Sequence, residues 1–394
     1  MSVPALRFKE FSNSWSEKKL CEISDIKTGP FGSTLHEADY VETGTPIITV
    51  EHLGEQGVVH KNLPLVSDED KIRLKSYNLR QGDIVFSRVG SVDRSCLISA
   101  KENGWLFSGR LLRVRLTDVN FCSIFLNQIF KNETVKYRIR SVAVGQTMAS
   151  LNTEILKNFS LVFPTSKPEQ TKIANFLTTV DEKITHLTQK HDLLTQYKKG
   201  VMQQIFSQEL RFKDDNGQDF PEWEEKEVGE VFKVTRGNVL AMPLVSESKT
   251  ETHQFPVYSS QTKNMGLSGY YNEHLYENSI TWTTDGANAG DVNYRDGKFY
   301  CTNVCGVLIS DDGYANACIA AMINAVSRKY VSYVGNPKLM NGVMAKIAIE
   351  FPCVKEQTKI ANFLNAIDDK ITSVQTQLQA VKQYKQGLLQ QMFV

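Results

Sequence analysis

The chain has 394 residues, 41% of them hydrophobic, and a formal net charge of +1 at pH 7. This length suits two ordinary domains, and the nearly neutral charge at first argues against a nucleic-acid partner. No apolar run is long enough to cross a bilayer and no charged-then-apolar leader follows Met1, so we expect a cytoplasmic protein without membrane contact. The seven cysteines are scattered without a CxxC pair, which argues against disulfides and against a metal site.

Residues 1–165 form the first predicted domain. Short apolar stretches separated by Gly and Asn turns dominate it, and helical signals such as that of residues 121–138 are few. This pattern favours an α+β domain with a curved antiparallel sheet.

The charge of this domain is uneven. Residues 71–140 hold fourteen Lys and Arg but only five Asp and Glu. Alternation predicts two basic strand faces, one carrying Arg113 and Arg115 and the other carrying Lys136, Arg138 and Arg140. Such a surface suits contact with phosphate, although a solvated basic face or an acidic protein partner also fits it.

The first long helix is predicted at residues 166–207. Its apolar positions alternate at spacings of four and three over about five heptads, which is the pattern of a coiled-coil seam. At 1.5 Å per residue, about 38 residues would make a rod of roughly 57 Å. The predicted pairing positions are Ile173, Leu177, Val180, Ile184, Leu187 and Leu194.

Residues 208–352 form the second predicted domain. Its opening, Arg211-Phe212-Lys213 followed by Trp223, echoes Arg7-Phe8-Lys9 followed by Trp15 at the start of the chain. The two domains are thus related, although distantly.

One shared feature of the domains is an apolar strand that ends in a polar Gly loop. It occurs at residues 83–90 and again at residues 278–286. The second domain differs in chemistry, because residues 241–340 are slightly acidic but dense in Asn and Tyr. These side chains can bond to base edges or phosphates without net charge, and they would equally suit ordinary turns and sheets.

The second long helix, predicted at residues 353–394, repeats the first. The nonapeptide Glu-Gln-Thr-Lys-Ile-Ala-Asn-Phe-Leu occurs at residues 169–177 and, unchanged, at residues 356–364, and further identities continue at the same offset of 187. Each apolar seam needs a partner, so we expect an antiparallel coiled coil, although two helices packed on separate cores also fit. The pairing positions of this copy are Ile360, Leu364, Ile367, Ile371, Val374 and Leu378.

The order of the repeats is circular. The Arg-Phe-Lys motif follows the first helix directly, whereas the motif that should follow the second helix opens the chain at Arg7. We therefore expect pseudo-twofold (circular) symmetry with both chain ends at one pole. Several glutamines are assigned to the outward helix faces, where they could dock a partner, although solvation also explains them: Gln170, Gln189, Gln357, Gln375 and Gln377.

The twin heptad helices, each entered through Phe-Pro and then Glu-Gln-x-x-Ile-Ala-x-Phe-Leu, resemble the conserved regions of the specificity subunits of type I restriction-modification enzymes. The resemblance covers essentially the whole chain, and the intervening segments are similar in size and order to that family's two target recognition domains. It implies a non-catalytic reader of double-stranded DNA, in which each domain grips one half of a bipartite site and the helical pair sets the spacer.

The same resemblance implies partners. Two methyltransferase subunits would dock on the helices, and translocase-nuclease subunits would join that core. S-adenosylmethionine, ATP and Mg²⁺ are expected on those partner subunits, and no cofactor is expected on this chain.

The family's recognition domains vary with their targets, so the DNA-binding residues are predicted from this sequence alone. Gly90 and Gly286 would let the backbone approach DNA closely, and these turns could equally face solvent. The candidate residues are Ser87, Arg88, Ser91, Arg94, Arg110, Arg113, Lys136, Arg138, Arg140, Gln146, Thr283, Thr284, Asp285, Asn288, Asn293 and Lys338.

Motifs for catalysis are missing from the sequence. It has no Asn-Pro-Pro-Tyr motif for adenine methylation and no GxGxxG or GxxxxGK[ST] loop for a nucleotide or S-adenosylmethionine. Two Glu-x-Lys tripeptides, at residues 69–71 and 224–226, match a nuclease pattern that recurs by accident. A coiled-coil adaptor that binds only proteins, and a self-sufficient nuclease or methyltransferase, are the alternatives to a DNA reader.

Overall fold

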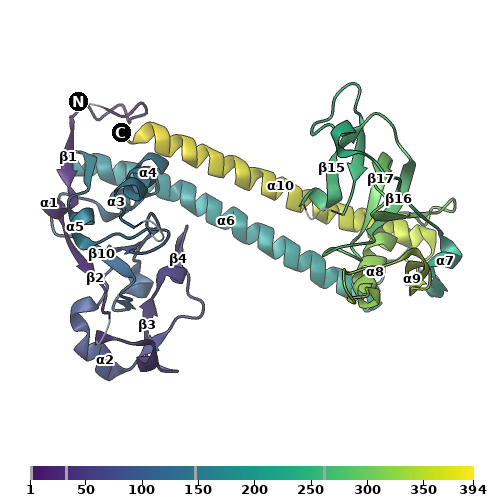
Figure 1. Cartoon of the computed structure of the whole chain (residues 1–394), viewed down its shortest axis with the longest axis horizontal. Coiled ribbons are helices and arrows are strands. Elements are labelled where there is room, and N and C mark those ends of the chain that lie inside the picture. Colours follow the sequence, from purple (N-terminus) through teal and green to yellow (C-terminus); the bar gives the residue numbers. More distant parts are fainter. Residues whose placement is uncertain (1–2, 32–33, 146–148, 261–262) are drawn as a thin grey trace. The chain divides into compact units, whose positions relative to one another are not determined.

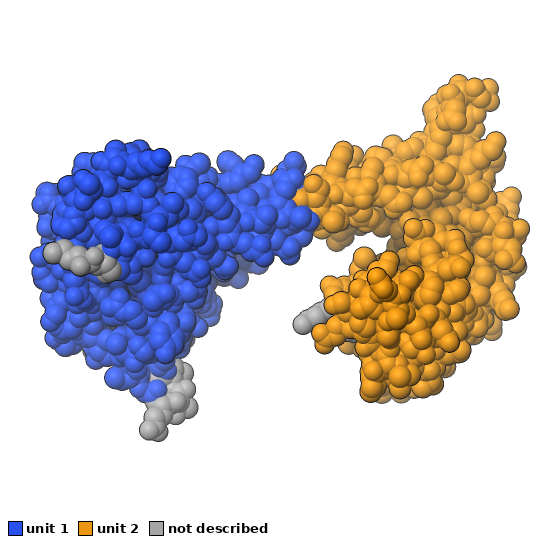
Figure 2. Space-filling model, turned by 90° about the horizontal axis from the view of Figure 1, so that it is seen from above, with its two compact units in different colours: residues 1–190, 374–394 blue, residues 191–373 orange. Residues whose placement is uncertain are grey.

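The chain divides into two compact units, which Figure 2 shows in different colours. Unit 1 comprises residues 1–190 and 374–394, and unit 2 comprises residues 191–373. Among the described residues no helix is both long and apolar enough to cross a membrane. The computed structural model describes residues 3–31, 34–145, 149–260 and 263–394.

Two long helices, α6 (Lys167–Phe206) and α10 (Val354–Met392), follow the two globular domains (Figure 1). In unit 1, Lys385 Nζ of α10 lies 2.5 Å from Asp181 Oδ1 of α6, and in unit 2, Lys198 Nζ of α6 lies 2.6 Å from Asp368 Oδ1 of α10. Residue numbers rise along α6 as those of the partners fall along α10, which is the antiparallel pairing that the sequence predicted.

The seam of the helices is apolar and largely buried. A buried Leu or Ile stabilises the fold by about 1.5–3 kcal/mol relative to an exposed one, so the seam is a main source of pairing energy. Leu194 and Ile371 are half-buried. The buried seam positions are Ile173, Leu177, Val180, Ile184, Leu187, Ile360, Leu364, Ile367, Val374 and Leu378.

The domain of unit 1 is mixed α and β. Its helices are α1 (Leu20–Ile23), α2 (Asp68–Arg73), α3 (Ser123–Phe130), α4 (Glu133–Val142) and α5 (Thr153–Lys157). Its strands are β1 (Trp15–Lys19), β2 (Ser24–Thr28), β3 (Thr45–Ile48), β4 (Leu53–Gly54), β5 (Gly57–Val58), β6 (Leu65–Val66), β7 (Ile84–Ser87), β8 (Ser95–Leu97), β9 (Leu106–Phe107), β10 (Leu111–Leu116) and β11 (Ser160–Pro164). The main sheet has the order β2-β10-β7-β8, and smaller sheets have the orders β6-β3-β9, β4-β5 and β1-β11.

The domain of unit 2 repeats this plan. Its helices are α7 (Val228–Val231), α8 (Ala317–Ser327) and α9 (Asn341–Ala345). Its strands are β12 (Glu224–Glu227), β13 (Lys233–Arg236), β14 (Phe255–Tyr258), β15 (Leu267–Tyr271), β16 (Tyr276–Thr283), β17 (Val292–Cys301), β18 (Cys305–Ile309) and β19 (Ala348–Phe351). The sheet order β13-β18-β16-β17-β14-β15 begins with the arrangement of β2-β10-β7-β8 in unit 1, and β12-β19 matches β1-β11.

The sheets are not purely antiparallel, which corrects the sequence-based expectation. β3 pairs in parallel with β9, and β14 pairs in parallel with β17. In both units the parallel strand is the segment with a proline followed by a β-branched residue, Pro46-Ile47 and Pro256-Val257. A long connection separates each pair along the chain, and a connection of that kind allows a parallel crossover.

The sequence placed Lys136, Arg138 and Arg140 on a strand face, and this prediction is wrong because they lie on α4. The Asn132 side chain caps this helix by accepting hydrogen bonds from the N–H groups of Thr134 and Val135. Alternation with period two was the misleading signal. The competing signal, an Asn cap before apolar residues spaced by four, determines the structure.

A buried glutamate with equivalent partners begins both copies of the nonapeptide. In unit 1, Glu169 is 0% exposed and accepts hydrogen bonds from Arg7 Nε at 2.6 Å and from Trp15 Nε1 at 3.3 Å. In unit 2, Glu356 is 0% exposed and accepts from Arg211 Nη2 at 2.9 Å and from Trp223 Nε1 at 2.9 Å. We name this arrangement the Arg-Glu-Trp lock, and it fastens each domain to the start of its helix.

The glutamine after each locked glutamate is buried, which corrects its assignment to the outward face. Gln170 Nε2 donates to the Pro164 carbonyl at 3.0 Å, and Gln357 Nε2 donates to the Pro352 carbonyl at 2.7 Å. Both side chains therefore fix the last strand of the domain to the helix, and neither is available for docking.

The described start of the chain and the end of α10 lie together in unit 1, as the circular order predicted. The Leu6 N–H donates to the Gln391 carbonyl at 2.8 Å. In unit 2, where the chain is continuous, the equivalent Leu210 N–H donates to the Gln204 carbonyl at 3.0 Å. The same backbone hydrogen bond therefore joins the end of a long helix to the following segment in both units, although the chain is continuous there only in unit 2.

Candidate nucleic-acid interface

In each unit the Gly loop after the central strand lies beside a second loop. In unit 1 the Gly90 N–H donates to the Ala149 carbonyl at 2.9 Å, and the Leu151 N–H donates to the Arg88 carbonyl at 2.8 Å. We refer to residues 88–94 and 149–151 as the paired loops of unit 1.

Unit 2 repeats this arrangement. The Gly286 N–H donates to the Pro337 carbonyl at 3.0 Å, and the Leu339 N–H donates to the Thr284 carbonyl at 2.9 Å. Residues 284–290 and 337–339 are the paired loops of unit 2. In each unit two loop segments that are distant in the sequence are therefore joined by two backbone hydrogen bonds.

Glycine is required in these loops by the backbone conformation. Gly90 has a φ of +77° and Gly286 a φ of +94°, the left-handed region that other residues rarely adopt. A Cβ atom added at either position would meet no heavy atom within 4 Å. The space above both turns is therefore open, and a bound molecule can approach the backbone.

In unit 1 the paired loops and the adjacent Arg110 present arginines that lack an acidic partner. Arg94 and Arg110 are exposed, and Arg88 is half-buried with Nη1 donating to the Gly109 carbonyl at 3.3 Å. None of the three forms an ion pair with another described residue, and Arg88 Nε has no hydrogen-bond partner among them. Exposed Ser91 lies in the same loop. Such unpaired guanidinium groups suit phosphate oxygens or guanine edges.

Other basic side chains that the sequence predicted as DNA contacts in unit 1 form ion pairs with acidic residues of the same domain. Arg113 is buried and paired with Asp25, and burial lowers the pKa of its guanidinium. Arg140 pairs with Asp93, and Lys136 Nζ lies 2.8 Å from Glu133 Oε1. The basic excess of residues 71–140 is thus partly neutralised inside the domain.

Several further candidates are buried or hydrogen-bonded within their own domain, and their assignment as DNA contacts stays a prediction. The Ser87 side chain is buried and donates to the Val89 carbonyl at 3.0 Å. Arg138 Nη2 donates to the Ser160 carbonyl at 2.8 Å. Thr283 and Thr284 are also buried, and Thr284 Oγ1 donates to the Val304 carbonyl at 3.0 Å. These hydrogen bonds to backbone carbonyls stabilise the conformation of the chain around them. Gln146 lies outside the described residues.

In unit 2 the paired loops carry little net charge. Asp285 Oδ1 and exposed Lys338 Nζ lie 3.9 Å apart, across the two loops. Asn288 Nδ2 donates to the Ser260 carbonyl at 3.3 Å. The surface equivalent to the arginine-rich loops of unit 1 therefore offers a carboxylate, an ammonium group and an amide.

A cavity of about 270 Å³ lies in unit 2 and contains two of the predicted residues, Thr283 and Asn293. It also contains Arg295, which is 7% exposed and which the sequence reasoning missed. Arg295 Nε donates to Thr281 Oγ1 at 2.9 Å, and its guanidinium lies 3.7 Å from the ring centroid of Tyr258.

Burial lowers the pKa of the Arg295 guanidinium, and no carboxylate among the described residues pairs with it. A buried cation without a counter-ion is expensive, so a bound anion or a hydrogen-bond acceptor is favoured there. Its signal in the sequence was the period-two spacing from Asn293 on β17, which places both side chains on one face of the strand.

Comparisons with known proteins agree with this architecture. A model of the type I restriction modification DNA specificity domain matches residues 13–196 and 221–383. Over 141 residues the chain is 38% identical to a protein of Mycoplasma pneumoniae described as a putative type I specificity subunit N-terminus, and the match covers 35% of the chain and 74% of that protein.

A second relative spans nearly the full length. The putative type I restriction enzyme MjaX specificity subunit of Methanocaldococcus jannaschii is 24% identical, with 96% of this chain and 93% of that protein covered. A crystal structure of the S subunit of a type I restriction-modification system from M. genitalium matches with a TM-score of 0.69 at 17% identity, covering 100% of this chain and 99% of that one. At that identity the match shows the fold alone.

Proposed function

The chain belongs to the family of type I restriction-modification DNA specificity proteins, and from this premise we propose that it selects the DNA target of such a complex by binding two half-sites, one with each unit. The observation that carries the proposal is the repeated pair of loops. Their backbone hydrogen bonds are the same in both units, whereas their exposed side chains differ. A shared scaffold with different side chains suits the reading of two different sequences.

In unit 1, Arg88 and Arg94 of the paired loops and the adjacent Arg110 bind DNA through guanidinium groups that reach phosphates or guanine edges. In unit 2, Asp285, Asn288 and Lys338 read base edges, and Arg295 and Asn293 line the cavity of the same unit. Electrostatic attraction contributes more to the first half-site, and hydrogen bonding contributes more to the second.

The helical pair sets the spacer between the half-sites. Deleting seven residues from both α6 and α10 keeps the apolar seam in register and removes about 10.5 Å of helix, which corresponds to about three base pairs of DNA. The methylated target of such a variant should have a spacer shorter by roughly that amount. A deletion variant that assembles and keeps the original spacer would contradict this role.

Catalysis belongs to partner subunits. Two methyltransferase subunits bind S-adenosylmethionine and dock on the helices, and translocase-nuclease subunits bind ATP and Mg²⁺. This chain contributes the choice of sequence and the assembly surface.

Mapping methylated adenines in a genome that carries this gene, with and without the gene, tests the proposal. The expected result is one bipartite motif that disappears with the gene. If the purified complex binds DNA without sequence preference in a gel shift, the chain is a protein-binding adaptor instead. Methylation or cleavage by the chain alone would establish a self-sufficient enzyme.

A further inference from the structure

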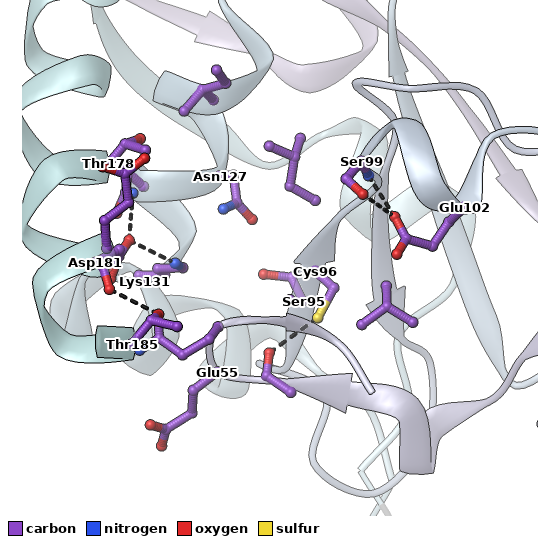
Figure 3. Close-up of a pocket in the computed structure, with 18 of the residues that line it drawn as sticks. Glu55, Ser95, Cys96, Ser99, Glu102, Asn127, Lys131, Thr178, Asp181 and Thr185 are labelled. Atoms are coloured by element: carbon purple, nitrogen blue, oxygen red, sulfur yellow. Dashed lines mark hydrogen bonds and ion pairs between the residues drawn. The ribbon is translucent and has the colours of Figure 1, made fainter. Parts of the chain in front are cut away.

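Unit 1 contains a cavity of about 750 Å³, and no residue of the paired loops is among those that line it (Figure 3). Its walls come from the β4-β5 hairpin, from β8, from α3 and from the first half of α6. Among the residues that line it, Asn127 comes from α3 and Asp181 from α6, whereas Glu55 comes from the turn of the hairpin.

Two deeply buried amide oxygens in this cavity lack a donor. Asn127 is 6% exposed and Gln128 is 2% exposed, and neither Asn127 Oδ1 nor Gln128 Oε1 has a hydrogen-bond partner among the described residues. Gln128 is held in place from its other end, because its Nε2 donates to Asp181 Oδ2 at 2.9 Å. Buried acceptors without partners are costly, so the cavity favours a molecule that brings N–H donors.

The excess of acidic side chains around the cavity favours a positively charged hydrogen-bond donor. Four carboxylates line it, on Glu55, Glu102, Asp181 and Glu182, against two lysines, Lys101 and Lys131.

Two of the acids are already satisfied. Glu102 accepts from Ser99 Oγ at 2.5 Å and contacts His60 Nε2 at 2.5 Å. Asp181 contacts Lys131 Nζ at 3.1 Å and Lys385 Nζ at 2.5 Å. Burial raises the pKa of the Asp181 carboxyl, but the two lysines and Gln128 offset this and hold the pKa below its ordinary value.

Glu55 and Glu182 remain at the exposed rim and form no ion pair with a described residue. A rim with two free carboxylates repels a DNA phosphate and attracts a cation. The unpaired amide oxygens behind the rim match the several N–H groups that a guanidinium presents in one plane.

We propose that this cavity binds an arginine side chain of a partner protein, which enters past Glu55 and Glu182 and donates to Asn127 Oδ1 and Gln128 Oε1. The proposal deepens the proposed function in one respect, because it rests on the chain working inside a multi-subunit complex. The β4-β5 hairpin has no matching strand pair among the described residues of unit 2, so the site occurs once per chain. A partner bound at this site therefore contacts unit 1 and has no equivalent site on unit 2.

Photo-crosslinking with the full-length chain in its assembled complex locates the occupant. A photoreactive amino acid replaces Glu55 in one sample and Glu17, an exposed residue of β1 in the same unit, in the control. The expected result is a crosslink from position 55 to a partner peptide that contains an arginine, and no such crosslink from position 17. A crosslink to DNA, or to a peptide without a basic residue, would overturn the proposal.

Variants test the chemistry of the site. The double charge reversal Glu55→Lys with Glu182→Lys should weaken binding to the partner methyltransferase subunit by about tenfold or more, whereas Glu17→Lys should leave it unchanged. Asn127→Leu removes an unpaired acceptor, so it should weaken the complex by about tenfold without lowering the denaturation midpoint of the free chain.

Equal affinity of the double variant and the parent chain would refute the cavity as a partner site. So would a loss of affinity in Asn127→Leu that is matched by unfolding of the free chain, because a merely structural Asn127 predicts that outcome. Sequence preference in a DNA gel shift separates the two proposals, since it should persist in all these variants if the chain reads DNA through its paired loops.

Discussion

Units 1 and 2 share a frame and differ in their surfaces. The Arg-Glu-Trp lock occurs in both units with the same three residue types, and Glu169 and Glu356 are buried to the same extent. The paired loops repeat only their backbone, because unit 1 presents unpaired arginines where unit 2 presents Asp285 and Lys338. The Arg-Glu-Trp residues are the same in both units because each set attaches a domain to its long helix. The exposed side chains of the loops differ, as expected if each unit reads a different half-site.

The same contrast occurs along the helices. Lys385–Asp181 in unit 1 and Lys198–Asp368 in unit 2 are equivalent ion pairs by the offset of 187. In unit 1 the carboxylate is also bound by Lys131 and Gln128 of the domain, so two ammonium groups share one acid. The helical frame is symmetric, and the domain that packs against it is not.

Breaking the lock should give the largest effect. Glu169→Ala leaves Arg7 and Trp15 without their buried acceptor, and Glu356→Ala does the same to Arg211 and Trp223. Each change should lower the free energy of unfolding by about 3 kcal/mol, measured by chemical denaturation, because it removes one partner of a buried ion pair.

Glu182→Ala, on the exposed face of α6, is the matched control and should change stability by less than about 0.5 kcal/mol. Unequal costs at Glu169 and Glu356, with one near zero, would contradict a shared frame.

A pH series should separate the two helical ion pairs. Burial and the neighbouring Lys131 lower the pKa of Lys385 to about 8 in the fold, against an ordinary value near 10.5. Between these two values the unfolded chain binds more protons than the folded one, so this lysine contributes stability that increases as the pH rises through that window. Relative to Lys385→Met, the parent chain should gain roughly 1–2 kcal/mol between pH 8 and pH 10.

Lys198→Met in unit 2 provides the comparison for that series. A similar pH dependence for both variants would mean that the two ion pairs have the same environment.

DNA binding should depend on salt through unit 1 more than through unit 2. Arg94→Ala should lower the slope of log affinity against log salt concentration by about 1, because a phosphate contact is lost. Asn288→Ala should leave that slope unchanged and reduce the preference for the half-site read by unit 2. Lys183→Ala, on the exposed face of α6, should alter neither quantity, and an equal slope change for Asn288→Ala would contradict the assignment.

The smallest effect is expected at the two loop glycines. Gly90→Ala and Gly286→Ala each place a side chain at positive φ, which should cost about 1 kcal/mol of stability in either unit. The two losses should agree within the error of a denaturation curve. A loss at only one glycine would show that the loops lack a common backbone.

Much of the architecture could be predicted from the sequence because the repeated structural elements have repeated sequence motifs. The nonapeptides, the 4-3 spacing of the seam and the Arg-Phe-Lys motifs predicted two paired helices and a circular order, and Leu6 bonding to Gln391 agrees with that order. Local patterns were less reliable. The alternating pattern predicted a strand for Lys136, Arg138 and Arg140, because the pattern takes no account of the helix cap that Asn132 provides for α4.

The candidate site was predictable only at the level of its loops. Gly90 and Gly286 marked the turns, but whether an arginine is free depends on acids far away in the sequence. Asp25 binds Arg113 across 88 positions, and no local pattern reveals that pairing. Arg295 was missed although it lies two residues from Asn293 on β17, because its cavity is formed by residues from separate strands and a helix.

The central claim is that each unit reads one half of the target. Replacing residues 17–165 with the equivalent segment of a related specificity subunit, and mapping the methylated adenines that result, tests it most directly. The account predicts a new motif in which one half has changed while the other half and the spacer length are retained. A motif in which both halves change, or in which neither changes, would contradict it.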